Sequence, residues 1–213
     1  MDAVQTALGG SSRQLTPLAD PDANDAAKAL LAGPWKVVHL SGHGINEVDK
    51  ASNERTTGML ISGTVVLGPT EMQAMDSVPE LVFVNCCHLG KIAGPGVTPQ
   101  GVFAASVAQQ LISDGVRCVV AAGWAVDDAG AAAFAKAFYE MLLHGQGFAD
   151  AVQAARSAAR RADPGGNTWA AYQCYGDPDW KLVAGPAVHA SALVARTVPS
   201  FATCEELLLA LES

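Results

Sequence analysis

The chain alternates short, continuous apolar runs with longer segments that have helical character. Continuous runs are typical of strands buried on both faces of a sheet, and they occur at Lys36–Ser41, Leu81–Val84 and Arg117–Ala122. Helices are predicted over Ala23–Ala32 with Asp20 as the cap, Gln100–Ser113, Asp127 to about His144, and Phe148–Ala162. This alternation predicts an α/β fold in three layers, with a mostly parallel central sheet and helices on both faces.

Polar or glycine-rich segments separate these elements. Gly44–Thr57 and Lys91–Pro99 follow two of the predicted strands. We expect both to be loops that rim the carboxyl edge of the sheet and that are mobile without substrate. Met59–Ser62 and Thr64–Leu67 flank Gly63, a pattern that predicts a small hairpin.

Length and charge limit the domain count and the class of partner. The 213 residues are enough for one well-buried domain, expected over residues 1–183, with 184–213 as a linker or the start of another segment. The formal net charge of −8 argues against a nucleic-acid groove or an anionic membrane as partner. No run approaches the roughly 18 apolar residues of a spanning helix. No secretory signal is visible, so a cytoplasmic protein is expected.

The cysteines indicate a reducing compartment. Their number is odd, and two of them are adjacent, which makes a bridge between those two strained. The five are Cys86, Cys87, Cys118, Cys174 and Cys204. Free thiols in a reducing cytosol are therefore expected.

Two of the apolar runs end in residues with nucleophilic or acid–base chemistry. His43 follows the first run and Cys87 follows the second. Open α/β sheets present their chemistry at the carboxyl ends of strands, so parallel neighbours would place these two residues side by side. A thiol beside an imidazole is the minimum needed for nucleophilic acyl transfer. The backbone N–H groups of Gly44 and Cys87 are candidates for the oxyanion hole.

Other interpretations of the same cluster remain open. A zinc site could be imagined from His39, His43, Cys86, Cys87 and His88. Their spacing is not that of a known zinc module, so no metal is predicted. His39 is expected to be a satisfied histidine within the sheet. Cys86 would face the opposite side of the pleat from Cys87, where core packing explains it.

Three motifs in this order resemble one known family. They are HLSGHG at His39–Gly44, FVNCCHLG at Phe83–Gly90 and GWAVDD at Gly123–Asp128. Over about residues 10–183 the chain resembles the CHAT domain, a branch of the caspase-like cysteine peptidases that includes separase. The family histidine is followed by glycine, which matches His43, and the family cysteine lies three residues before a glycine, which selects Cys87. The resemblance implies a caspase-like sandwich and a Cys-His endopeptidase that needs no cofactor.

The third motif bears on substrate choice. In separase, which this loop resembles, the acid four residues after the tryptophan binds arginine in the specificity pocket. Trp124 and Asp128 hold those positions here, so cleavage after Arg or Lys is implied. Asp127 is the alternative carboxylate, and either acid could instead simply cap the helix that begins there. Trp124 would wall the pocket or pack under the loop.

The expected partners are a protein or peptide substrate and further domains or a regulatory protein. The family's sheet normally begins with a strand before the first helix, and this chain is expected to start after that strand, as part of a longer protein. The main alternative function is a scaffold module that keeps the caspase-like fold without turnover. A nucleotide-binding domain would want a glycine-rich turn after its first strand, and Gly9-Gly10 lacks that fingerprint.

Overall fold

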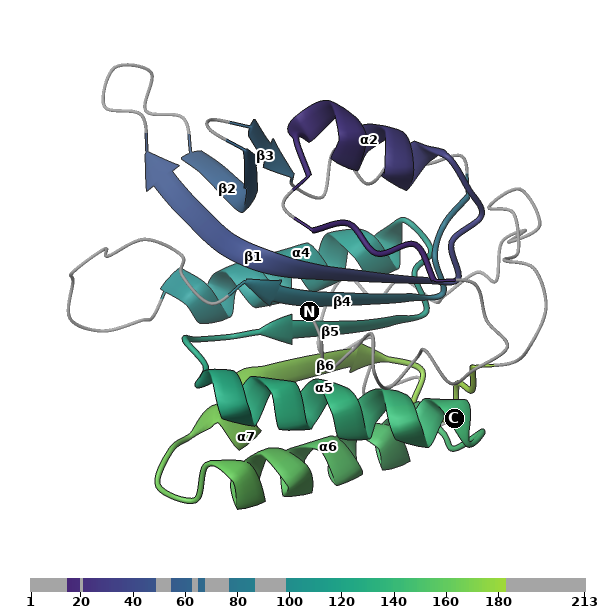
Figure 1. Cartoon of the computed structure of the whole chain (residues 1–213), viewed down its shortest axis with the longest axis vertical. Coiled ribbons are helices and arrows are strands. Elements are labelled where there is room, and N and C mark those ends of the chain that lie inside the picture. The colour runs from purple at the N-terminus through teal and green to yellow at the C-terminus, as the bar shows by residue number, and fades with distance from the viewer. Residues whose placement is uncertain are drawn as a thin grey trace, which may run out of the picture.

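The computed structural model describes residues 15–19, 21–48, 55–62, 65–67, 77–86 and 99–182. Six strands form one sheet in the order β3-β2-β1-β4-β5-β6 (Figure 1). Their bounds are β1 Val37–Val48, β2 Arg55–Ser62, β3 Val65–Leu67, β4 Leu81–Cys86, β5 Cys118–Ala122 and β6 Tyr172–Gly176. The central strands β1, β4 and β5 are parallel, and β2, β3 and β6 pair antiparallel with their neighbours.

Helices cover both faces of this sheet. They are α2 Ala23–Leu31, α4 Pro99–Ser113, α5 Asp128–Leu143, α6 Phe148–Ala162 and the short α7 Thr168–Ala171. Figure 1 shows α5 and α6 together on one side, while α4 lies on the other. This confirms the predicted α/β architecture, which is compatible with a caspase-like fold. None of the described helices is long and apolar enough to cross a bilayer.

Strand β4 is the centre of both core layers. Leu81 and Phe83 belong to the core shared with α5 and α6, whereas Val82 and Val84 belong to the core shared with α4. All four side chains are buried, because successive side chains of a strand point to opposite faces and both faces are covered. The continuous apolar run of this strand therefore has a direct structural cause.

The loop predicted over Gly44–Thr57 is wrong for much of its length. Strand β1 continues to Val48, and residues 43–48 pair with 55–60 of β2 in an antiparallel ribbon. The remaining residues, 49–54, lie outside the described part of the chain, as do residues 91–98 of the second predicted loop. The polar composition misled the prediction because an antiparallel ribbon tolerates polar side chains that a buried parallel strand excludes.

Two further details refine the predicted elements. The cap of α2 is Asp22 and not Asp20, since the Asp22 carboxylate accepts the backbone N–H of Asp25 at 2.8 Å. The predicted hairpin is confirmed: β2 and β3 pair antiparallel, with Met59 opposite Leu67.

Candidate active site

The carboxyl end of β4 lies beside the middle of β1, at the point where the parallel pairing of the two strands stops. Their parallel pairing runs from Val37 opposite Leu81 to Gly42 opposite Cys86. His43 is the next residue of β1, and Cys87 follows Cys86 in the chain. Cys87 itself and the side chain of His43 lie outside the described residues. The segments that lead into the two predicted catalytic positions thus end at the same point of the sheet edge.

Strand β1 changes partner at this point. Up to Gly42 it pairs with β4, and from His43, opposite Leu60, it pairs with β2. The chain runs from β1 to β2 on one side and then returns to β4 on the other, so β1 and β4 form a topological switch point. Open α/β sheets bind their ligands in the crevice at such a point. The predicted oxyanion donor Gly44 lies in the ribbon, opposite Met59.

The end of β4 is fixed by a hydrogen bond across the sheet. The Tyr172 hydroxyl donates to Oδ1 of Asn85 at 3.0 Å. Tyr172 is fully buried at the start of β6, and Asn85 lies two residues before Cys87. Sequence reasoning missed this pair. Its only signal was the amide at the end of an otherwise apolar run, and nothing in the sequence pointed to a partner 87 residues away.

His39 is a structural residue of the sheet. Its Nδ1 is hydrogen-bonded to the Tyr139 hydroxyl at 2.9 Å, and its ring stacks on Phe83 with centroids 4.6 Å apart. Burial lowers the pKa of His39 from 6.5 to about 4, because the charged imidazolium would be desolvated among aromatic rings. The prediction of a satisfied sheet histidine is confirmed.

We expect His39 to make stability depend on pH between about 6.5 and 4. In this window the unfolded chain binds a proton at His39 and the native protein does not, so the free energy of unfolding falls as pH falls. From pH 6.5 to 4.5 the contribution is about 2 to 3 kcal/mol. Urea unfolding at both pH values should show a smaller loss for His39→Gln than for wild type. His144→Gln, at an exposed histidine, is the control and should leave the loss unchanged.

The loop between β5 and α5 presents the two acids differently. Asp127 is the N-cap of α5, and its carboxylate accepts the backbone N–H groups of Ala129 and Gly130 at 2.9 and 3.0 Å. Asp128 is exposed in the first turn, and its carboxylate makes no hydrogen bond or ion pair with the part of the chain that the structure describes. Asp127 is therefore engaged in capping, whereas the Asp128 carboxylate is available.

The residues that begin α7 hold this loop in place. Trp124 Nε1 donates to Asn167 Oδ1 at 3.1 Å, and the backbone N–H of Asp127 donates to Thr168 Oγ1 at 3.0 Å. Thr168 is 2% exposed and donates in turn to the Asp163 carboxylate. Gly130 packs so closely that an added Cβ would lie 2.8 Å from the Thr168 methyl group. Backbone and indole of the predicted specificity loop are thus tied to α7.

The two remaining described cysteines are poor nucleophiles. Cys118 and Cys174 are free thiols, as expected. Burial raises the pKa of each to about 12, so neither is a thiolate near neutral pH. Cys118 lies wholly inside the core of the sheet.

The fold is an α/β sheet in which the parallel pairing of β1 and β4 ends beside the two predicted catalytic positions. The family model of the CHAT domain matches residues 1–177, so the chain belongs to the CHAT domain family. This family is related to the caspase-like cysteine peptidases. A comparison with curated proteins gives no match.

Proposed function

We propose that the chain is a cysteine endopeptidase that acts through a dyad of Cys87 and His43. The observation that carries this proposal is the parallel register of β1 and β4, in which Gly42 lies opposite Cys86. The residues that follow these two are a histidine and a cysteine. The register supports the proposal because the paired strands that precede these two residues lie at a topological switch point, where such folds bind ligands.

The chemistry follows from the two side chains. The Cys87 thiolate attacks the peptide carbonyl carbon, and backbone N–H groups of Gly44 and Cys87 stabilise the oxyanion. The imidazolium of His43 protonates the leaving amine as the C–N bond breaks, which leaves an acyl-enzyme. Neutral His43 then takes a proton from water, and the resulting attack releases the carboxylic acid and restores the thiol.

Asp128 is the proposed determinant of specificity, with a preference for arginine over lysine before the cleaved bond. Its support is the division of roles between the two acids, because capping engages the Asp127 carboxylate, whereas the exposed Asp128 carboxylate has no partner among the described residues. The tie of Trp124 to Asn167 keeps the loop in one geometry. A carboxylate binds a guanidinium through two parallel hydrogen bonds, whereas lysine offers only a point charge.

A paired substrate series tests the peptidase and its specificity together. Peptides with Arg, Lys, Asp or Ala before the cleaved bond are offered to wild type and to Asp128→Ala. We expect wild type to prefer Arg, and the substitution to lower kcat/KM for Arg about 100-fold while changing the Ala substrate little. Asp127→Ala is the matched control, and its effect should be on stability through the lost cap. An Arg preference untouched by Asp128→Ala, or a preference for Asp, would contradict the assignment.

The alternative function is a scaffold module without turnover. The two functions are distinguished by treating the protein with a peptide that ends in arginine and carries an active-site-directed alkylating group. A peptidase is labelled at Cys87 alone, and the label is located by mass spectrometry. A protein that binds the peptide without labelling, and that cleaves no member of the series, is a scaffold.

A further inference from the structure

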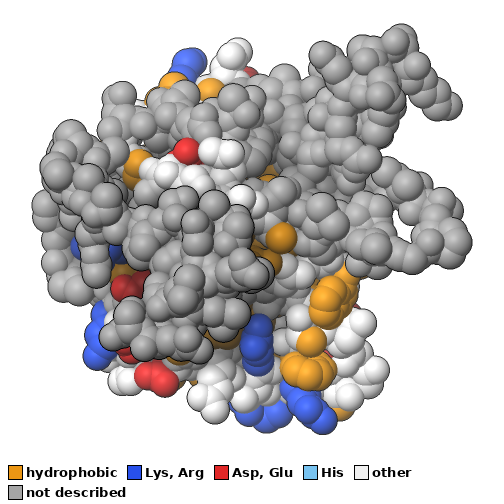
Figure 2. All heavy atoms as spheres, turned by 180° about the vertical axis from the view of Figure 1, so that it is seen from behind, with side chains coloured by type: hydrophobic (Ala, Val, Ile, Leu, Met, Phe, Trp, Pro, Cys, Tyr) orange, Lys and Arg blue, Asp and Glu red, His pale blue; other side chains and the backbone are white. Residues whose placement is uncertain are grey.

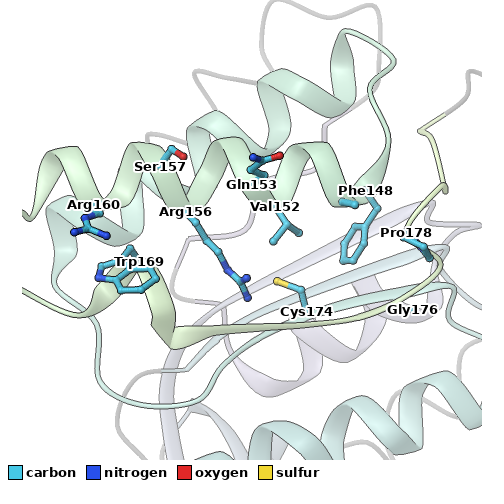
Figure 3. A pocket seen from close by; sticks show the side chains of 11 residues that line it. Phe148, Val152, Gln153, Arg156, Ser157, Arg160, Trp169, Cys174, Gly176 and Pro178 are labelled. Atoms are coloured by element: carbon cyan, nitrogen blue, oxygen red, sulfur yellow. The ribbon is translucent and has the colours of Figure 1, made fainter.

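A groove of about 510 Å³ lies between α6 and the edge strand β6, which β5 separates from β4. Figure 3 shows α6 running along β6, with Phe148 and Val152 towards one end, Arg156 reaching down beside Cys174 of β6, and Arg160 beside Trp169 at the other end. One half of the groove is therefore apolar and the other is cationic.

The floor of the groove is the edge strand β6, which pairs with β5 and with no other strand of the described residues. The Asp177 N–H donates to the Arg117 carbonyl, and the Gly123 N–H donates to the Ala171 carbonyl. The backbone N–H and C=O groups of the odd-numbered residues of β6 therefore face β5. Backbone groups alternate along a strand, and those of Cys174 and Gly176 consequently face outwards. Outward N–H and C=O groups on an edge strand are a template for a further strand.

The charge of the groove is opposite to that of the chain. Among the residues that the structure describes, no acidic residue lines it, although the chain carries a net charge of −8. Arg156 is held by one hydrogen bond from Nη2 to the Tyr172 carbonyl at 3.2 Å, and the Arg160 guanidinium lies 5.4 Å from the centre of the Trp169 ring. Each guanidinium has five N–H donors, so both can still bind a carboxylate. Figure 2 shows basic side chains along the lower rim of the molecule, where Figure 1 places α6.

We propose that this groove binds an extended, acidic peptide segment of a partner protein, added as a strand beside β6. The lining stretch of α6 from Phe148 to Arg160 is about 18 Å long, which matches about five extended residues. Arg156 and Arg160 are one helical turn apart, about 6 Å along the axis. Residues i and i+2 of a strand are about 6.7 Å apart on one face.

The sequence pattern that this groove recognises is therefore two acidic residues separated by one other residue. Both carboxylates face α6 and meet the two arginines, while the backbone between them pairs with β6. An apolar residue on the same face of the segment fits the half lined by Phe148 and Val152. The site is independent of Cys87, so it recruits a partner whether or not that partner is cleaved.

Fluorescence anisotropy with a labelled peptide tests this site. The probe alternates Glu and Thr and contains no Arg or Lys, so it is not a substrate, and the protein is the full chain carrying Cys87→Ala. We expect saturable binding that Arg156→Gln and Arg160→Gln each weaken about tenfold. Arg161→Gln is the matched control, because Arg161 is exposed on the same helix and does not line the groove. Equal weakening by all three substitutions would mean non-specific attraction and would overturn the site.

Two further measurements test the strand pairing. Methylation of alternate backbone nitrogens of the probe should abolish binding in one register and spare it in the other, because only one set of N–H groups faces β6. Insensitivity to both methylation patterns would overturn strand addition. A doubled mass in solution without peptide binding would show that β6 pairs with a second copy of the chain, and that result would overturn the acidic-peptide proposal.

Discussion

We expect Cys87→Ala to abolish peptide hydrolysis and Cys86→Ala to retain substantial activity. The thiol of Cys87 is the only nucleophile in the proposed mechanism, so its removal should lower kcat/KM by roughly four orders of magnitude or more. Cys86 ends the paired part of β4, opposite Gly42, and has no chemical role in the reaction. The measurement is kcat/KM on a peptide with arginine before the cleaved bond.

Thermal melting provides the control for both cysteine variants. The two proteins should unfold within a few degrees of wild type, because the described core is anchored by β4 residues earlier in the strand, Leu81 to Val84. If Cys86→Ala is inactive and Cys87→Ala is active, the motif is out of register by one residue. Activity in both variants would exclude Cys86 and Cys87 as the nucleophile and would contradict the proposed mechanism.

His43→Ala should be about as damaging as Cys87→Ala. The two side chains act as a unit, so the double variant should be no slower than either single variant. The comparison is kcat/KM for both single variants and the double variant on the same substrate. If the double variant lowers kcat/KM by the product of the two single-variant factors, the residues act independently.

His39→Gln is the matched histidine control. His39 lies four residues earlier on the same strand, but it is bonded to Tyr139 and stacked on Phe83. Its replacement should change the free energy of unfolding and leave kcat/KM within a few-fold of wild type at pH 7. A fully active His43→Ala protein would contradict the peptidase proposal.

The buried strands were predictable because each consists of consecutive apolar residues. Val82 and Val84 face α4 while Leu81 and Phe83 face α5 and α6, and no polar residue interrupts the run. The parallel pairing of β1 with β4 followed from the alternation of strands and helices. The specificity loop was also locatable, since Asp127 caps α5 as its residue type predicts.

The remaining features depend on contacts that local sequence does not encode. The ribbon of β1 and β2 is polar enough to resemble a loop, and only the pairing of residues 43–48 with 55–60 makes it a strand. The bond from Tyr172 to Asn85 and the contact of Thr168 with the start of α5 join positions far apart in the chain. The arginines of α6 have the pattern of a solvated face, and β6 is what turns that face into one wall of a groove.

The change of partner within β1 has a mechanical consequence. Up to Gly42 the strand is locked beside β4, which is itself held by β5 and by helices on both faces. From His43 onwards it belongs to the ribbon with β2 and β3, at the end of the sheet. In the proposed peptidase, a displacement of that ribbon would therefore move His43 relative to the end of β4. A ligand bound to β2 or β3 would then change the distance between His43 and Cys87 without occupying the active site.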